Sequence, residues 1–323
     1  MRTDMTEPLL KITDLEVSYA TRAGLVKAVD KVSLEVQRGE TLGLVGESGC
    51  GKSTLGFSIL RLVRPPGEIT GGQIIFNGED LLQKTEQEMR TIRGKRIAMI
   101  FQDPMTCLNP LQRIDDHFIE TVRTHEKAVS AQEARQKAAE LVDRLGIIAD
   151  RLTDYPHQLS GGMRQRIMIG LALILNSELI IADEPTTSLD VIVEAQILDL
   201  MKELKASFEL SMILITHNMG IVAELADRIA VMYAGKLMEV ASAVELYDKP
   251  LHPYTQGLLR SIPNISLDSQ KLETMPGSPP DLIEPPPGCR FHPRCPHVMD
   301  KCHTYEPIMK EVEDGHRVAC WLY

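Results

Sequence analysis

The stretch TLGLVGESGCGKST, residues 41–54, decides the fold of this 323-residue chain. A short apolar run, residues 41–45, leads into a glycine-rich loop and then into a helix predicted to begin near Lys52. Residues 46–53 match GxxxxGK[ST], a loop whose backbone N–H groups converge on phosphate oxygens, with the lysine near the outer phosphates and the hydroxyl of Ser53 on magnesium. The predicted nucleotide-binding residues are Gly46, Glu47, Ser48, Gly49, Cys50, Gly51, Lys52, Ser53 and Thr54. The alternative is a glycine-rich turn without a ligand, which the strand–loop–helix context disfavours.

A second apolar run, residues 179–182, ends in two adjacent carboxylates. Asp183 stands where phosphate-loop enzymes place a second magnesium ligand, and Glu184 then becomes a candidate general base for an attacking water. The alternative is a strand-end carboxylate that only caps the next helix. Because a phosphate loop is present in the same chain, the catalytic interpretation is favoured.

Around these motifs the patterning predicts an α/β fold. Residues 9–19 and 28–36 alternate apolar and polar side chains, as strands of an antiparallel edge sheet would, whereas residues 179–185 and 211–217 resemble buried parallel strands. From Asp103 the chain becomes helical, with a capping-box pattern at Ser130 and Glu133 that opens a helix ending near Gly146. We therefore predict a P-loop NTPase (RecA-like) core with an antiparallel β subdomain and a helical insertion over residues 103–165.

Proline becomes frequent from about residue 240, which predicts a small Cys- and Pro-rich extension. The expected domains are a nucleotide-binding domain over residues 1–240 and an extension over residues 241–323.

Composition narrows the class of protein. A formal net charge of -10 opposes the basic surface that nucleic-acid binding favours, so no nucleic-acid partner is expected. The longest apolar run, residues 167–175, is shorter than the roughly 20 residues that span a bilayer. The first residues, MRTDMTEPLL, lack the apolar core of a signal peptide, which predicts a cytoplasmic protein.

Residues 159–166, LSGGMRQR, precede a helical apolar run and form a second candidate phosphate site. Ser160, Gly161 and Gly162 would open that helix, where backbone N–H groups and the helix dipole favour an anion. This stretch resembles the signature sequence of ABC ATPases, with Met163 where glutamine is commonest. The resemblance implies a head-to-tail dimer, in which ATP on one phosphate loop is closed by the signature helix of the second subunit.

The same resemblance extends to four further positions. It implies that Tyr19 stacks on adenine and that Gln102 binds magnesium and links the third phosphate to a membrane subunit. It also implies that Asp190 belongs to a loop reporting to the opposite site and that His217 orients the third phosphate. Taken singly, a tyrosine is more often a packing residue and a histidine after a strand more often a polar cap. Two departures from the family pattern are Asn218, where aspartate is common, and Cys107, where serine is usual.

Four longer stretches, FQDPMTCLNP, YPHQLSGGMRQR, ADEPTTSLD and HPYTQGLLRSIP, resemble the ATPases of dipeptide and oligopeptide permeases. The resemblance covers nearly the whole chain. It implies ATP and Mg²⁺ as cofactors, two transmembrane permease subunits, a second identical or homologous ATPase subunit, an extracytoplasmic substrate-binding protein, and a place on the cytoplasmic face of the membrane. Related systems carry nickel, glutathione or antimicrobial peptides, so the cargo stays open.

Four cysteines are clustered near the C-terminus: Cys289, Cys295, Cys302 and Cys320. Because nothing indicates secretion, they predict metal ligands more than disulfides. The spacing of five, six and seventeen intervening residues lacks the C-x2-C pair of common zinc ribbons. Some relatives that the chain resembles hold a 4Fe–4S cluster there, and Pro296 after a cysteine fits such a site. Zinc, aided by His292, His297, His303 and His316, and metal-free packing are the alternatives.

Two other classes compete with a transport ATPase. A soluble ABC ATPase of DNA repair or translation would be expected to carry a long coiled coil, a second cassette or basic patches, none of which is evident in the sequence. A P-loop kinase or GTPase would lack the signature sequence. The sequence therefore favours a transport ATPase.

Overall fold

The structure is a computed structural model that describes residues 7–187, 189–261 and 275–323. The chain forms two compact units, one made of residues 1–83 and 214–323 and the other of residues 84–213. The boundary predicted near residue 240 falls inside a strand, β10 (Lys236–Ser242). The division into a nucleotide-binding domain and an extension stays a prediction.

The first unit contains the predicted antiparallel sheet. Its strand order is β2-β1-β4-β5, with β1 (Leu10–Thr21), β2 (Gly24–Val36), β4 (Gly67–Phe76) and β5 (Glu79–Asp80). Leu10 pairs with Val36 and Ile12 with Leu34, so the alternating apolar residues of both strands share one buried face. The antiparallel interpretation of these two stretches is confirmed.

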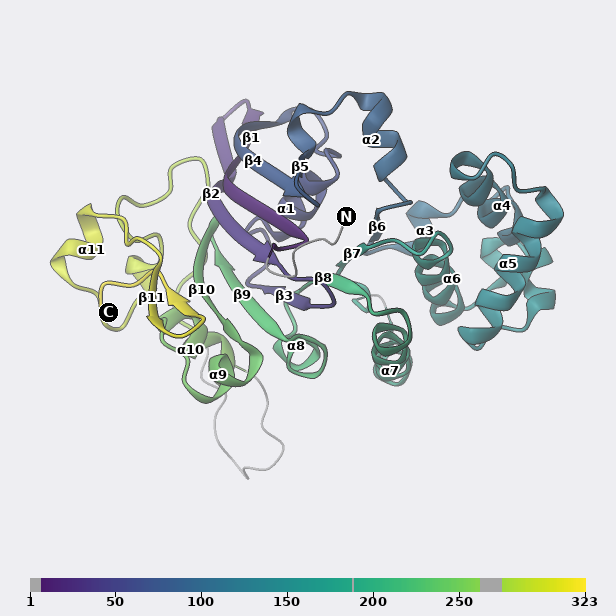
Figure 1. Ribbon diagram of the computed structural model, residues 1–323. Coiled ribbons are helices and arrows are strands. Elements are labelled where there is room, and N and C mark those ends of the chain that lie inside the picture. The colour runs from purple at the N-terminus through teal and green to yellow at the C-terminus, as the bar shows by residue number, and fades with distance from the viewer. Residues whose placement is uncertain (1–6, 188, 262–274) are drawn as a thin grey trace. The chain divides into compact units, whose positions relative to one another are not determined.

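The same unit contains strands of a second, mixed sheet in the order β11-β12-β10-β9-β3-β8, which is antiparallel from β11 to β9 and parallel between β9 and β3. Their bounds are β3 (Thr41–Val45), β8 (Ser211–Thr216), β9 (Arg228–Tyr233), β11 (Lys310–Glu313) and β12 (His316–Val318). Every residue of β3 and β8 is buried, as expected of central parallel strands. The helical segments are α1 (Lys52–Ile59), η1 (Leu81–Gln83), α8 (Met219–Leu225), α9 (Ala243–Asp248), α10 (Pro253–Arg260), η4 (His292–Arg294) and α11 (Asp300–Thr304). Of these, α8 packs on β3 and α9 packs on β9 and β10 (Figure 1).

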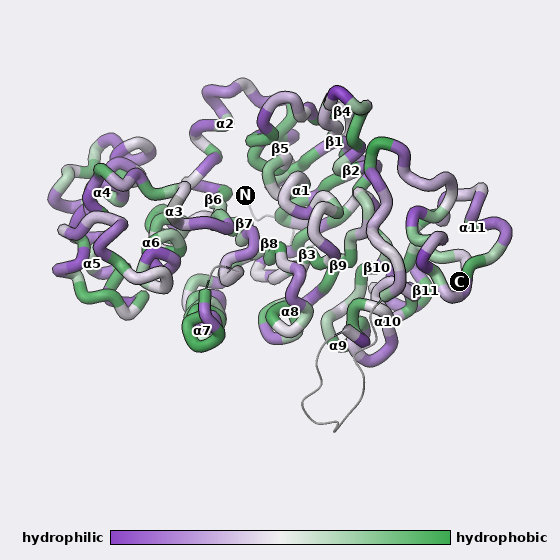
Figure 2. Tube along the Cα trace, turned by 180° about the vertical axis from the view of Figure 1, so that it is seen from behind, coloured by the Kyte–Doolittle hydropathy of each residue, from purple (hydrophilic) through white to green (hydrophobic). Residues whose placement is uncertain are grey.

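The second unit combines two parallel strands with the predicted helical insertion. Strand β6 (Ile97–Ile100) pairs in parallel with β7 (Leu179–Asp183). The helices are α2 (Glu86–Ile92), α3 (Pro104–Cys107), α4 (Ile114–His125), α5 (Ala131–Arg144), η2 (Ala149–Thr153), η3 (Pro156–Gln158), α6 (Gly161–Leu173) and α7 (Val191–Phe208). Hydrophobic and hydrophilic residues alternate along α4 and α5, whose apolar sides pack on each other and on α6 (Figure 2).

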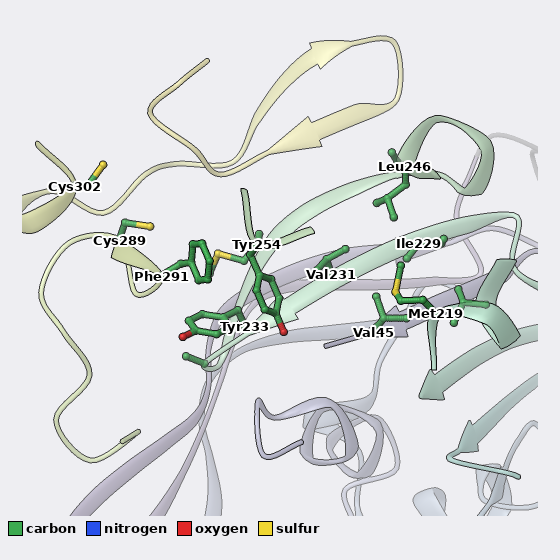
Figure 3. Close-up of a cluster of buried hydrophobic side chains, with 14 residues drawn as sticks. Val45, Met219, Ile229, Val231, Tyr233, Leu246, Tyr254, Cys289, Phe291 and Cys302 are labelled. Carbon is green, nitrogen blue, oxygen red and sulfur yellow. The ribbon is translucent and has the colours of Figure 1, made fainter. Parts of the chain in front are cut away.

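The C-terminal residues share the core of the first unit. Strand β12 pairs with β10, and Phe291 packs against Tyr233 of β9 and Tyr254 of α10, with each ring centroid 5.3 Å from that of Phe291 (Figure 3). A proline-rich segment of this size builds a poor core alone. It is stabilised here by the packing of Phe291 on Tyr233 and by the pairing of β12 with β10 in the first unit.

Candidate functional site

The predicted phosphate loop connects β3 to α1, as the sequence requires. Gly46 has φ 150° and Gly51 has φ 104°, and a Cβ on either would lie 2.0 Å from a backbone carbonyl oxygen, that of Met232 or of Ala28. Only glycine allows the loop to approach these two strands so closely. The loop tip, Ser48 and Gly49, is exposed, so its backbone can reach a ligand.

Lys52 is held inside the loop. Its side chain is buried, and the ammonium donates hydrogen bonds to the carbonyl oxygens of Gly46 at 2.7 Å and Glu47 at 3.1 Å. Phosphate oxygens at the loop would meet this cation at close range. Ser53 and Thr54, both half-buried, follow in the first turn of α1.

Cys50 is a packing residue of the loop. Burial raises the pKa of its thiol, and the nearby Lys52 opposes that shift only in part. A neutral, buried thiol is not a nucleophile. Cys50 therefore fills space within the loop, where it is buried.

The candidate base and its neighbour Gln102 lie together in the second unit. Asp183 is the buried last residue of β7, and Glu184 follows with a left-handed φ of 46°, which is uncommon for a residue other than glycine. The Glu184 carboxylate accepts hydrogen bonds from Thr187 Oγ1 at 2.7 Å and from Gln102 Nε2 at 3.5 Å. Thr187 was not singled out in the sequence, although its spacing of three residues from a strand-end carboxylate could have suggested it.

The signature residues open helix α6. The Ser160 hydroxyl caps the helix by accepting a hydrogen bond from the backbone N–H of Met163 at 3.3 Å. A Cβ on Gly162 would lie 2.6 Å from Cγ1 of Val193 on α7. This glycine therefore also allows two helices to pack closely, a structural role that the sequence did not reveal.

Asp190 caps α7. Its carboxylate accepts the backbone N–H groups of Ile192 at 3.1 Å and Val193 at 3.0 Å. Its neighbour Ser188 lies outside the described residues.

Tyr19 and His217 both belong to the first unit. Tyr19 is half-buried on β1, and a Cβ on Gly67 would lie 2.4 Å from its ring, so the ring covers this glycine of β4. His217 is exposed directly after β8, and Asn218 caps α8 by accepting the N–H of Gly220 at 2.9 Å. An asparagine supplies this cap without the charge of the usual aspartate.

Two residues from beyond position 250 contact the phosphate loop, and neither contact was predicted from the sequence. The Tyr254 hydroxyl accepts the backbone N–H of Glu47 at 2.9 Å, and the Arg294 guanidinium binds the Glu47 carboxylate through two hydrogen bonds of 2.6 and 3.0 Å. Tyr254 belongs to the stretch HPYTQGLLRSIP, and Arg294 directly precedes Cys295. Their partner lies about 200 positions or more away, which leaves no local pattern to read.

The four C-terminal cysteines share one neighbourhood. Burial raises the pKa of the Cys289 thiol to about 11, and the charges of Cys302, Cys320 and Cys295 act in the same direction. The backbone N–H of Cys289 also bonds the carbonyl of Cys302 at 2.9 Å. Nevertheless, across residues 7–187, 189–261 and 275–323 no group of three or more His, Cys, Asp or Glu side chains is arranged to hold a metal ion. The predicted metal site is therefore not supported by this geometry.

Two of the histidines proposed to aid zinc, His316 and His292, have other partners. His316 is fully buried, and its Nε2 lies 2.8 Å from the buried Glu239 carboxylate. The rings of His292 and His303 lie 4.5 Å apart, and His292 Nδ1 lies 2.9 Å from the Cys289 carbonyl oxygen. His316 is thus committed to a buried polar pair.

In the described part of the chain, no helix combines the length and the apolar character needed to cross a membrane.

The chain matches two family models, "ABC transporter" over residues 29–187 and "Oligopeptide/dipeptide transporter, C-terminal region" over residues 238–302. It is 47% identical to the dipeptide transport ATP-binding protein DppD of Bacillus subtilis, over 98% of this chain and 95% of the relative. It is 44% identical to the oligopeptide transport ATP-binding protein OppD of Salmonella typhimurium, over 97% of this chain and 93% of the relative.

The fold matches a solved structure, the dimeric post-hydrolysis state of the ATP-binding cassette MJ0796 bound to ADP and phosphate. The match covers 72% of this chain and 98% of the MJ0796 chain. The two share 26% identity at a TM-score of 0.66. The predicted P-loop NTPase fold is confirmed. The chain has a phosphate loop, a signature helix and a strand-end Asp–Glu pair, and its relatives match it along nearly the whole sequence. It therefore belongs to the ABC transporter ATPase family, in the group that contains DppD and OppD.

Proposed function

We propose that this chain binds and hydrolyses ATP to drive the import of dipeptides or oligopeptides. The observation that carries the proposal is the near full-length similarity to dipeptide and oligopeptide transport ATP-binding proteins, which includes the C-terminal region. The buried Lys52 and the close-packed glycines of the phosphate loop support it, since they suit a triphosphate.

In this proposal the loop residues 46–54 bind the phosphates and Tyr19 stacks on adenine. Ser53, Asp183 and Gln102 would hold Mg²⁺, and they supply the hard oxygen donors that this ion prefers. When bound, the ion neutralises charge on the outer phosphates. Gln102 directs its amide nitrogen at Glu184, which leaves its carbonyl oxygen as the atom for a metal.

Glu184 is the proposed general base. It takes a proton from the attacking water, whose oxygen bonds to the terminal phosphorus while the bond to the ADP oxygen breaks. Thr187 and Gln102 hold the carboxylate oriented for this step. His217, the residue directly after β8, is proposed to contact the terminal phosphate.

The signature residues Ser160, Gly161 and Gly162 are proposed to close the nucleotide of a second ATPase subunit, with Asp190 in the adjoining loop. The similarity to a cassette solved as a dimer supports this arrangement. The second subunit would be a copy of this chain or a homologue.

The complete transporter in this proposal has two transmembrane permease subunits and an extracytoplasmic binding protein, with this chain on the cytoplasmic face of the membrane. Nickel, glutathione or antimicrobial peptides are the alternative cargoes. The binding protein and the permease subunits would select among them.

The test is uptake by the reconstituted transporter in vesicles that contain ATP. Labelled dipeptides and oligopeptides are expected to accumulate, and Lys52→Ala in this chain should abolish accumulation by weakening ATP binding. The exposed Lys137→Ala, on helix α5, is the matched control and should transport normally. If nickel or glutathione accumulated and peptides did not, the peptide cargo would be rejected in favour of that cargo. Unchanged ATP affinity in Lys52→Ala would refute the role of the loop.

We further propose that Cys289, Cys295, Cys302 and Cys320 bind a 4Fe–4S cluster, with zinc as the alternative. Cys289 and Cys302 lie in one buried cluster against which Cys295 packs, which supports a shared site, and four thiolates suit either group. The described arrangement fits no single metal ion, so the proposal depends on a measurement. Anaerobically purified protein should be coloured and contain about four irons. Colourless protein with bound zinc, or with no metal, would reject the cluster.

A further inference from the structure

Glu47, the second residue of the phosphate loop, is held from three directions. Lys52 of the loop itself binds its carbonyl oxygen at 3.1 Å, and Tyr254 binds its backbone N–H at 2.9 Å. Arg294 binds both of its carboxylate oxygens, at 2.6 and 3.0 Å. Two of these three partners lie in the C-terminal region, so this region fixes the loop directly.

Arg294 is itself locked in place. Its side chain is 5% exposed, its Nε donates to the carbonyl oxygen of Pro276 at 2.8 Å, and Nη1 also reaches the Tyr233 hydroxyl at 3.3 Å. The guanidinium lies 5.7 Å from the centre of the Tyr233 ring. A cation held by this many contacts loses little entropy when it binds a carboxylate, so the pair is pre-organised.

A second arginine of the same short segment reaches the other end of the loop. Arg290 binds the carbonyl oxygen of Ala234 and the carboxylate of Asp30. The next residue, Gly235, donates its N–H to the carbonyl oxygen of Cys50 at 2.9 Å. Residues 290–294 therefore support the phosphate loop directly at Glu47 and through a turn at Cys50.

The charge of Glu47 explains why this support would matter to ATP. A carboxylate within a phosphate-binding loop repels a triphosphate, and the repulsion is strong where protein excludes water. The two-pronged contact with Arg294 cancels that charge and fixes the carboxylate in one orientation. An unpaired Glu47 would both repel the nucleotide and loosen the loop.

We propose that Arg294 is a positioning residue for ATP, acting through Glu47, so that the C-terminal region sets the affinity of the phosphate loop. The proposal rests on the proposed phosphate-binding role of residues 46–54. Arg294 directly precedes Cys295, which places the cysteine segment one residue from the contact. Any change at the cysteines that moves this segment is thereby transmitted to the nucleotide loop.

The test compares Arg294→Met with the double variant Arg294→Met/Glu47→Gln in the full-length chain. Arg294→Met should raise the KM for ATP by on the order of fivefold or more, with a smaller change in kcat. The double variant should recover a large part of the lost affinity, because removal of the carboxylate removes the repulsion. Glu47→Gln alone completes the cycle and gives the coupling between the two side chains.

Ionic strength provides a second readout that a purely structural role would not change. Salt screens the unpaired carboxylate, so the KM difference between wild type and Arg294→Met should narrow from about 0.05 M to about 0.5 M salt. Metal content and melting temperature, measured on the same samples, separate this effect from loss of the fold or of a bound group.

Arg93→Met is the matched control. Arg93 binds Glu86 through two hydrogen bonds of 2.6 and 3.2 Å in the second unit, and neither residue belongs to the proposed site. It should leave KM and kcat unchanged. Normal ATP affinity in Arg294→Met, or a double variant no better than the single one, overturns the inference. Lys52→Ala distinguishes this failure from failure of the phosphate loop itself, since it tests the loop without Arg294.

Discussion

Glu184 combines backbone strain with two side-chain contacts. A left-handed φ of 46° is maintained although it costs free energy, and Thr187 and Gln102 fix the carboxylate. Strain of this kind persists where surrounding contacts impose it, and it is concentrated at functional positions. The geometry suits a group that must hold one orientation toward a water molecule.

We expect Glu184→Gln to bind ATP normally and to hydrolyse it roughly 100-fold or more slowly, because the amide cannot accept the proton of water. The substitution keeps the size of the side chain and leaves one carbonyl oxygen that can accept the hydrogen bonds from Thr187 and Gln102. Phosphate release gives the rate, and size-exclusion chromatography with ATP should detect a trapped dimer. A rate close to that of the wild type would assign the base to another residue.

At single positions, the sequence predicted the groups that lie in local motifs. The structure places Lys52 inside the loop and Gln102 beside Glu184, and the roles that the motifs assign to them stay predictions. The contact of Arg294 with Glu47 was not predictable in this way. Its two partners are 247 positions apart and meet only because the chain folds back on itself.

Among the elements, helices α6 and α7 pack closely at a glycine, Gly162. A Cβ on Gly162 would lie 2.6 Å from Cγ1 of Val193, and a valine side chain cannot turn away without a rotamer change. The signature sequence therefore serves helix packing as well as its proposed anion site.

Gly162→Ala should destabilise the second unit by about 1–3 kcal/mol through overpacking. Adding Val193→Ala opens the space and should restore most of the stability. Urea denaturation measures both effects, and ATPase assays on the same proteins separate packing from the proposed phosphate contact. If the double variant remained as unstable as the single one, the close contact between the helices would not be the cause.

Helix α10 begins at a buried histidine. His252 Nδ1 accepts the backbone N–H of Tyr254 at 3.0 Å, and burial lowers the pKa of His252 to about 3. In the unfolded chain a histidine takes up a proton near pH 6.5. The unfolded state therefore binds more protons as the pH falls from about 6.5 toward 3, and stability falls with it.

The free energy of unfolding should fall by up to about 1.4 kcal/mol for each pH unit within that window. His252→Asn keeps a capping acceptor but cannot be protonated, so its stability should depend less on pH between about 7 and 5. Denaturant titrations at several pH values give the comparison. Parallel pH curves for the two proteins would mean that His252 does not control acid sensitivity.

The predictability of elements follows their length and their capping residues. The capping box at Ser130 and Glu133 correctly indicated α5, because its signal is local and its helix is long. Strands β11 and β12 were not predicted. They have four and three residues, and β11 is exposed throughout, so they carry no apolar alternation to recognise.

At the scale of the whole molecule, the described C-terminal residues Cys289, Phe291 and Cys302 belong to the same buried cluster as Tyr233 and Val231 of β9. Phe291 is 1% exposed and packs on the rings of Tyr233 and Tyr254. The sequence indicated a separate tail because its composition changes near residue 240. Composition cannot show that Phe291 packs on Tyr233, which lies before that change.

Phe291→Ala should lower the free energy of unfolding by about 3–5 kcal/mol. Ile308 is 70% exposed in the same region, and Ile308→Ala should lower it by less than about 0.5 kcal/mol. The single tryptophan, Trp321, reports on the C-terminal region by fluorescence, while circular dichroism follows the whole chain. We expect both signals to change together in urea. An early fluorescence transition would instead show that this region unfolds independently.

Strand β11 has one more consequence, for the behaviour of the protein at high concentration. As the last strand in the order of its sheet, it offers an outer row of backbone groups to which a strand of another molecule could attach. All four of its residues are exposed, and Lys310, Glu311 and Glu313 place charges along this border, with Glu313 paired to Lys249. Such charges discourage edge-to-edge pairing with a strand of another molecule, so this short strand protects the sheet from aggregation.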